Sequence, residues 1–163
     1  MNNNDVYQII VNCKNELNNI KKIINNLKQT SNIIPYLTKY TVIKTCGTIE
    51  LSFKTLISDF CSKNQNKQIK NYLDKTIRNS SMNPSIDNIF NLLKKFDSSW
   101  HFKFKKIIKN HKKSNKIIFS IKSLNETRNL FAHGGNPTIT FHSIINYFYD
   151  SIVIIYILDN ILK

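Results

Sequence analysis

The chain has 163 residues, the size of one ordinary domain, and 41% of them are hydrophobic, as in globular proteins. It has only three glycines and three prolines, too few to form the tight turns of a fold with many short strands, so the composition favours helices. The formal net charge of +14 attracts polyanions, with nucleic acid as the first candidate and anionic membrane as the second. An Asn-, Lys- and Ile-rich composition can also reflect AT-rich coding with solvated lysines, so charge alone does not choose a partner.

Apolar side chains that recur every three or four residues predict helices through most of the chain. The fourth expected helix has Asn83 as its N-cap and Pro84 at its first position, and the last is capped by Thr140. The expected helices cover residues 5–27, 38–61, 66–78, a segment from 84, 116–133 and 140–162. The expected core positions include Ile43 in the second helix and, in the last, Ile144, Phe148, Ser151, Ile155, Leu158 and Leu162. The prediction is a single all-α domain over 1–163, a helical bundle with long first, second and last helices.

The three cysteines, Cys13, Cys46 and Cys61, are odd in number and have no C-x-x-C spacing, which argues against disulfides and a zinc site and fits a reducing cytoplasm. The first ten residues lack a basic stretch followed by a long apolar run, so we expect no signal peptide. The apolar segment 151–162 is shorter than a membrane span and predicts a core helix. We expect a cytoplasmic protein without membrane contact, metal or cofactor.

An aromatic and basic segment, DSSWHFKFKKIIKNHKKSNK, occupies residues 97–116. Its WHFKFK stretch alternates like a strand, but one short strand has no partner, so we predict a loop plus a short helix. The lysines could follow an RNA backbone while an aromatic stacks on an unpaired base; alternatively the aromatics are core and the lysines are solvated. The candidate RNA-binding residues are Trp100, Lys103, Lys105, Lys106, Lys109, Lys112 and Lys113.

An arginine and a histidine stand near the end of the expected 116–133 helix. Arg128 falls on the same helical face as Ile121 and Leu124, and a guanidinium on an apolar face needs a carboxylate, a phosphate or a wet subunit interface. A buried pair with Glu50 or Glu126 would satisfy it structurally. His133 precedes two glycines, as a helix C-terminal residue often does.

The stretch SLNETRNLFAHGG, residues 123–135, sets four residues between Arg128 and His133, with Asn129 directly after the arginine. With this motif ahead of a last long helix, the chain resembles the HEPN superfamily, most closely the RiboL-PSP type. CGTIELSFKTLI, residues 46–57, resembles the second helix of that group, with Glu50 as its acidic position. A related group of toxins has a modified tyrosine where this chain has Gly135, so that regulation is not carried over.

The resemblance implies a metal-independent endoribonuclease that acts as a homodimer, with two Arg/His motifs facing one another across a composite active site. His133 would transfer protons, Arg128 would hold the phosphate, Asn129 would orient one of them, and Glu50 would position Arg128. Attack by the 2′-hydroxyl of RNA, tRNA included, would leave 2′,3′-cyclic phosphate and 5′-hydroxyl ends.

The same resemblance implies a toxin of a toxin–antitoxin pair or an anti-phage defence effector, with a cognate antitoxin or defence partner. The alternative is a non-catalytic HEPN module that binds RNA or a partner protein, in which Arg128 and Glu50 are internal structure. A membrane-surface protein is disfavoured, because no helix separates a lysine face from a large apolar face.

Overall fold

The computed structural model describes residues 1–162, which form α-helices and one π-helical turn, with no strand in that range. This confirms the all-helical prediction. The helices are α1 (Asn4–Asn26), α2 (Ile33–Ser62), α3 (Lys67–Leu73), α4 (Ile86–Phe96), α5 (Ser98–Asn110), α6 (Ser114–Ala132) and α7 (Phe141–Ile161), and the π-helical turn η1 (Asp74–Arg78) continues α3.

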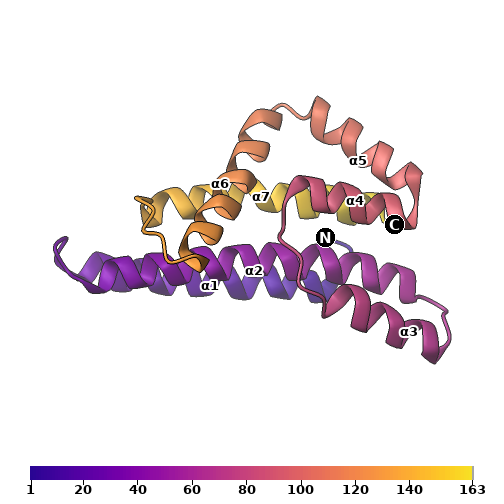
Figure 1. Cartoon of the computed structure of the whole chain (residues 1–163), viewed down its shortest axis with the longest axis horizontal. Helices are drawn as coiled ribbons and strands as arrows, with labels where there is room; N and C mark the ends of the chain where they lie inside the picture. The colour runs from indigo at the N-terminus through magenta and orange to yellow at the C-terminus, as the bar shows by residue number, and fades with distance from the viewer. Residues whose placement is uncertain (163) are drawn as a thin grey trace.

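α1 and α2 form a long antiparallel pair, α7 packs along α2, and α6 crosses from the end of α5 down to α2 (Figure 1). A continuous apolar core joins these helices, with Phe53 of α2, Phe104 of α5 and Phe148 of α7 among its fully buried side chains. The C-terminal end of α6 is thereby set on the α1–α2 pair, away from α5. This arrangement separates the two sequence regions in which functional residues were expected.

The last helix is built as its periodicity predicts. Thr140 caps α7 by accepting a hydrogen bond from the Ser143 backbone N–H at 3.1 Å. The predicted core stripe of α7 is buried throughout: Ile144, Phe148, Ser151, Ile155, Leu158 and Leu162. By length and composition the whole 21-residue helix could cross a membrane, but here it packs against α2, α5 and α6 as a core helix.

The structure corrects the predicted start of α4. Ser85, rather than Asn83, is the N-cap, because its Oγ accepts a hydrogen bond from the Asn88 backbone N–H at 3.1 Å. Asn83 and Pro84 therefore lie in the connection before α4, which we call the 79–85 loop. This leaves the Asn83 side chain available to another element.

The predicted loop plus short helix over 97–116 is also wrong. Asp97 caps a regular helix, α5, by accepting a hydrogen bond from the Ser99 backbone N–H at 2.6 Å. Phe104 and Ile108, four residues apart, are buried on its inner face, so the helical period outweighs the short alternation of WHFKFK. In α2, which begins earlier than expected, Ile43 was predicted to be core but is 56% exposed.

Candidate functional site

Arg128 lies on the inner face of α6, where the Leu124 carbonyl contacts the buried Cys46 Sγ of α2 at 3.5 Å. The arginine is half-buried, and its guanidinium donates a hydrogen bond to Asn83 Oδ1. The expected carboxylate partner is not there, since Glu126 lies 3.8 Å from Lys122 and Glu50 pairs with Lys54. A neutral amide holds Arg128, so its positive charge is available to an anion.

Glu50 anchors the 79–85 loop to α2 instead of contacting Arg128. Its Oε1 accepts hydrogen bonds from Lys54 Nζ at 2.9 Å and from the Met82 backbone N–H at 2.8 Å. Lys54 also donates to the Ser80 carbonyl, and the two charged side chains are only 13% and 6% exposed. A nearly buried ion pair with further hydrogen bonds at both ends fixes the loop in place.

Three residues of α6 hold the other side of the same loop. Asn125 is buried and donates to the Pro84 carbonyl at 3.1 Å and to the Ile121 carbonyl at 2.9 Å. Arg128 bonds Asn83 Oδ1, and Asn83 Nδ2 lies 3.4 Å from Asn129 Oδ1. Asn83 thus connects two of the predicted catalytic residues. Sequence analysis missed this role, because Asn83 lies 45 positions from Arg128 and carries no motif of its own.

Burial is the main cause of the shifted pKa of Cys46, and two nearby charges modify it. Burial raises the pKa of the Cys46 thiol to about 12; the nearby charge of Arg128 lowers the pKa, and that of Glu50 raises it. Both charged residues therefore lie close to one buried thiol, although they do not bond each other. A thiol with so high a pKa is a poor nucleophile, so Cys46 belongs to the packing and not to the chemistry.

His133 lies at the end of α6, where the helix opens to solvent. It is the C-cap residue; its backbone N–H donates to the Asn129 carbonyl at 3.0 Å, and its side chain is exposed. Gly134 follows with φ +79°, a conformation that glycine adopts without strain. Gly135 passes so close to Leu130 that an added Cβ would meet the Leu130 carbonyl oxygen at 2.9 Å. The two glycines end the helix sharply and leave the imidazole uncovered.

The predicted RNA-binding lysines are exposed, but they lie away from the motif. Residues 113 and 133 are the two caps of α6, so at 1.5 Å per residue about 30 Å separates them, and α5 continues further from the motif (Figure 1). Trp100 does not share the exposure of the lysines, because it is half-buried and packs edge-on against Phe60 at 5.2 Å. The structure therefore joins Arg128 and Asn129 through Asn83, places His133 at the end of the same helix, and keeps the basic segment apart.

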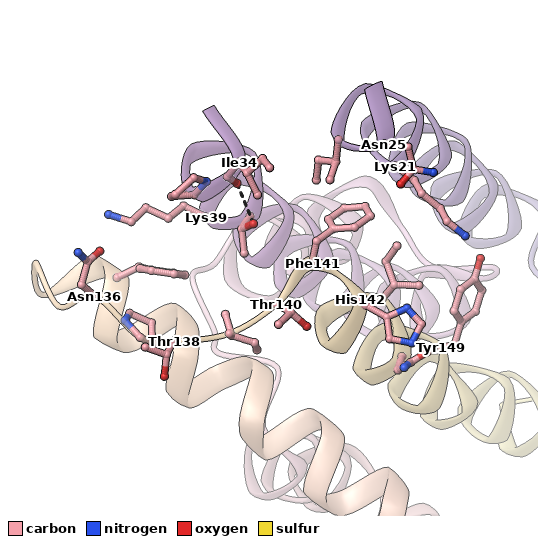
Figure 2. A pocket seen from close by; sticks show the side chains of 18 residues that line it. Lys21, Asn25, Ile34, Lys39, Asn136, Thr138, Thr140, Phe141, His142 and Tyr149 are labelled. Atoms are coloured by element: carbon pink, nitrogen blue, oxygen red, sulfur yellow. Dashed lines mark hydrogen bonds between the residues drawn. The ribbon is translucent and has the colours of Figure 1, made fainter. Parts of the chain in front are cut away.

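An apolar hollow of about 780 Å³ lies beside the end of α6, between α1, α2 and the start of α7 (Figure 2). Phe131, two residues before His133, lines it, and Lys39 Nζ lies 5.3 Å from the centre of the Phe131 ring. Lys21 and Lys39 are the two lysines among its lining residues, with His142 and Tyr149 along the α7 side. The hollow is a separate feature from the Arg128 contacts, which face the 79–85 loop.

Fold and site together describe a helical bundle with an arginine and a histidine at an open helix end. A family comparison matches residues 9–163 to the RiboL-PSP-HEPN family, and the chain belongs to this family. The family supports an RNA-related role. No curated protein and no solved structure matches the chain. Within residues 1–162, no group of three or more His, Cys, Asp or Glu side chains is placed to hold a metal ion.

Proposed function

We propose that this protein is a metal-independent endoribonuclease whose active site is built on Arg128 and His133. The observation that carries the proposal is the setting of Arg128. It is a half-buried guanidinium held by the neutral amide of Asn83, and five residues later on the same helix an exposed histidine stands at the open helix end. A fixed charge without a carboxylate partner is suited to a phosphate whose oxygens gain negative charge during the reaction.

The chemistry is a transesterification within the RNA. The 2′-oxygen forms a bond to the adjacent phosphorus while the bond from phosphorus to the 5′-oxygen breaks. A histidine accepts the 2′-hydroxyl proton, and a second acid returns a proton to the leaving 5′-oxygen. Arg128 binds the phosphate oxygens, and Asn129, linked to Asn83, helps to orient the phosphate or the histidine. The products carry 2′,3′-cyclic phosphate and 5′-hydroxyl ends.

One motif supplies one histidine, whereas the reaction has two proton transfers, so we propose a homodimer in which each site takes a histidine from both subunits. An exposed apolar stripe on α2 supports self-association next to the motif. Tyr36, Tyr40, Ile43 and Leu51 follow one another at spacings of four, three and eight, and are 72%, 45%, 56% and 42% exposed.

The charge around this stripe also favours contact between two copies of a basic protein. Lys44 is paired with Glu16 at 2.5 Å, and Lys54 is paired with Glu50 at 2.9 Å. Repulsion between subunits is therefore lower on this face of α2 than on the lysine-rich α5. A dimer formed here would place the exposed end of α6 near its symmetry mate.

The first experiment replaces the 2′-hydroxyl at a mapped cleavage position with hydrogen. Cleavage there should stop while neighbouring positions are still cut, because the attacking oxygen is gone. Persistent cleavage at the 2′-deoxy position would mean that water or another nucleophile attacks, and the proposal would be wrong.

A mixing experiment tests the shared site. Inactive His133→Ala chains, added in excess to the wild type and allowed to exchange subunits, should lower the cleavage rate below that of the same amount of wild type alone, because each mixed dimer contains only one of the two histidines. A rate equal to that of the wild type alone, once mixed dimers have formed, would contradict the composite site while leaving the chemistry intact.

We further propose that the enzyme acts in the cytoplasm as the toxin of a toxin–antitoxin pair or as an anti-phage effector. A basic protein that cuts RNA has to be restrained in its host. Expression of the wild type should arrest growth and degrade RNA, and expression of His133→Ala should do neither. Equal arrest by both forms would contradict a nuclease-based toxin.

The second candidate function is a non-catalytic module that binds a partner protein, and the hollow beside α6 favours it. Apolar walls with Lys21 and Lys39 among the lining suit a segment that carries apolar and acidic side chains. If purified protein cuts no RNA but binds such a peptide, and Lys39→Glu weakens the binding, this function replaces the first.

A further inference from the structure

The aromatic residues of α5 differ in how much of each ring is exposed and can contact a ligand. Trp100 packs on Phe60, and Phe104 is fully buried with its ring 5.4 Å from that of Phe90. Phe102 is 68% exposed, which leaves its ring face open. The aromatic that can stack on a base is therefore Phe102 and not Trp100, the residue that the sequence suggested.

Three lysines surround Phe102 on the same face of α5. Lys105, Lys106 and Lys109 follow it by three, four and seven residues, which places them within about 60° of Phe102 around the helix. All three are exposed, and none forms an ion pair within the part of the chain described. An open aromatic ring within a group of uncompensated cations is the pattern of single-stranded nucleic acid binding.

The surrounding sequence adds to the positive charge around Phe102. Residues 98–125 contain eight lysines and no acidic residue, so this stretch contributes +8 to a formal net charge of +14. Two of the eight are paired, Lys116 with Asp150 at 3.3 Å and Lys122 with Glu126 at 3.8 Å. The remaining positive charge is concentrated on α5 and the turn that follows it, which favours a polyanion as the ligand.

A lipid surface fits these observations less well than a nucleic acid. The other exposed apolar residue of α5, Ile107, is 41% exposed but lies about 140° from Phe102 around the helix. A helix that lies in a membrane interface needs its apolar residues on one face. Phe102 is instead a single apolar side chain among lysines, the size and setting of a platform for one base.

We propose that the Phe102 face of α5 binds an unpaired stretch of the RNA substrate, with Phe102 stacked on a base and Lys105, Lys106 and Lys109 on the phosphates. The identity of the ligand as substrate rests on the proposed nuclease function. Within one subunit, α5 ends next to the start of α6, whereas His133 lies at the other end of α6, about 30 Å away along the helix. An RNA that occupies both surfaces therefore spans about 30 Å, or about nine nucleotides at a stacked spacing of about 3.4 Å.

The test measures binding separately from cleavage. A fluorescent, unstructured 2′-O-methyl RNA of about 12 nucleotides, which cannot undergo 2′-attack, is titrated with protein and followed by anisotropy. Phe102→Ala and Phe102→Leu should each weaken binding about tenfold, because both remove the ring, and Phe102→Tyr should bind like the wild type. A duplex of the same sequence should bind in a way that does not depend on Phe102.

Phe119→Ala is the matched control, because Phe119 is an aromatic side chain of α6 with 58% exposure that packs against Tyr147 instead of standing open. It should leave RNA binding unchanged. Wild-type affinity in Phe102→Ala and Phe102→Leu would overturn the proposal. So would equal losses for duplex and single strand, or loss of binding to phosphatidylserine vesicles without loss of RNA binding.

Cleavage of an ordinary RNA by the same variants separates this proposal from the nuclease function. If RNA binding depends on Phe102 but the wild type cuts no RNA, the result supports the α5 binding surface and contradicts the nuclease function. If the wild type cuts RNA, and the Phe102 variants bind and cut RNA as well as the wild type does, the result contradicts the α5 binding surface and supports the nuclease function.

Discussion

The C-terminal end of α6 and the outer face of α5 are both basic, but they are built in opposite ways. At the end of α6, one arginine is half-buried and held through a network that includes Asn83, Asn125 and the Glu50–Lys54 pair. On α5, the lysines are exposed, and none of them pairs with a carboxylate within residues 1–162. A group that stabilises a transition state must be fixed in position, whereas a group that attracts a polyanion needs only charge and reach. The two regions are therefore suited to chemistry and to binding, respectively.

The largest effect is expected at the motif itself. His133→Ala should lower the cleavage rate by about 10³-fold or more, because a positioned general acid or base is lost. His142→Ala removes another exposed histidine and should leave the rate unchanged. Initial rates on end-labelled RNA, with circular dichroism as the check on folding, measure both. A fully active His133→Ala variant would place the chemistry elsewhere.

The Glu50–Lys54 pair tests whether Glu50 supports the fold or the reaction. Glu50→Gln should lower the free energy of unfolding by about 3 kcal/mol, because it leaves the nearly buried Lys54 without its counter-charge. Glu50→Leu combined with Lys54→Met should recover most of this stability. Urea denaturation of the three proteins measures the effect. If Glu50→Gln is as stable as the wild type but inactive, Glu50 acts in catalysis and not through the loop.

Asn83 links the fixed network to the proposed chemistry. Asn83→Ala should lower the cleavage rate about tenfold at saturating RNA, because Arg128 loses the hydrogen bond that orients it. The matched control is Asn91→Ala, an exposed asparagine of α4 outside the 79–85 loop. A rise in KM at unchanged kcat would show instead that the loop contributes to binding.

The lysines of α5 should affect binding through salt dependence. Replacing Lys105 and Lys109 by glutamine should weaken RNA binding several-fold and reduce the slope of log Kd against log salt by about 1.4, since each of the two phosphate contacts contributes about 0.7. The same change at Lys21 and Lys22 of α1 removes equal charge from another surface and should alter the slope less. Identical slopes for the two double variants would mean that only the net charge matters.

The smallest effect is expected in the α1–α2 pair that supports the motif. Lys44, followed by the Tyr40 hydroxyl, lowers the pKa of Glu16. The ionised Glu16 side chain therefore stabilises the folded protein above the ordinary glutamate pKa of about 4.3. This stabilisation is lost as the pH falls through the lower pKa that Glu16 has in the folded protein. Because both partners are about one third exposed, Glu16→Gln should cost less than about 1 kcal/mol at pH 7, and the difference should become smaller as the pH falls below about 4.3. Urea denaturation at a series of pH values measures this, and a difference that does not decrease at acid pH would exclude the ion pair as its cause.

The sequence predicts the long helices well because their apolar periodicity is continuous. The core stripe of α7 and its Thr140 cap are examples, and both are confirmed. Local patterns fail where two of them compete. In α5 the six-residue alternation WHFKFK suggested extended chain, but the spacing of Phe104 and Ile108 determined the structure, and with it which aromatic remained exposed.

The candidate site shows a second limit, because its connections are long-range. Arg128 and His133 are visible in the sequence as a motif, whereas Asn83 meets Arg128 only through the packing of α6 against the 79–85 loop. The Glu50–Lys54 pair has the four-residue spacing of a helical ion pair, a local signal that was available in the sequence. We predicted that Glu50 lies against Arg128, whereas its partner is Lys54, one turn further along the same helix.

The most direct test of the central claim is incubation of purified wild type and His133→Ala with a tRNA pool and a mixed-sequence RNA in the presence of EDTA, followed by analysis of the product ends. The account predicts cleavage by the wild type alone, with 2′,3′-cyclic phosphate and 5′-hydroxyl ends. Cleavage that EDTA abolishes, that His133→Ala retains, or that leaves 5′-phosphate ends would contradict it.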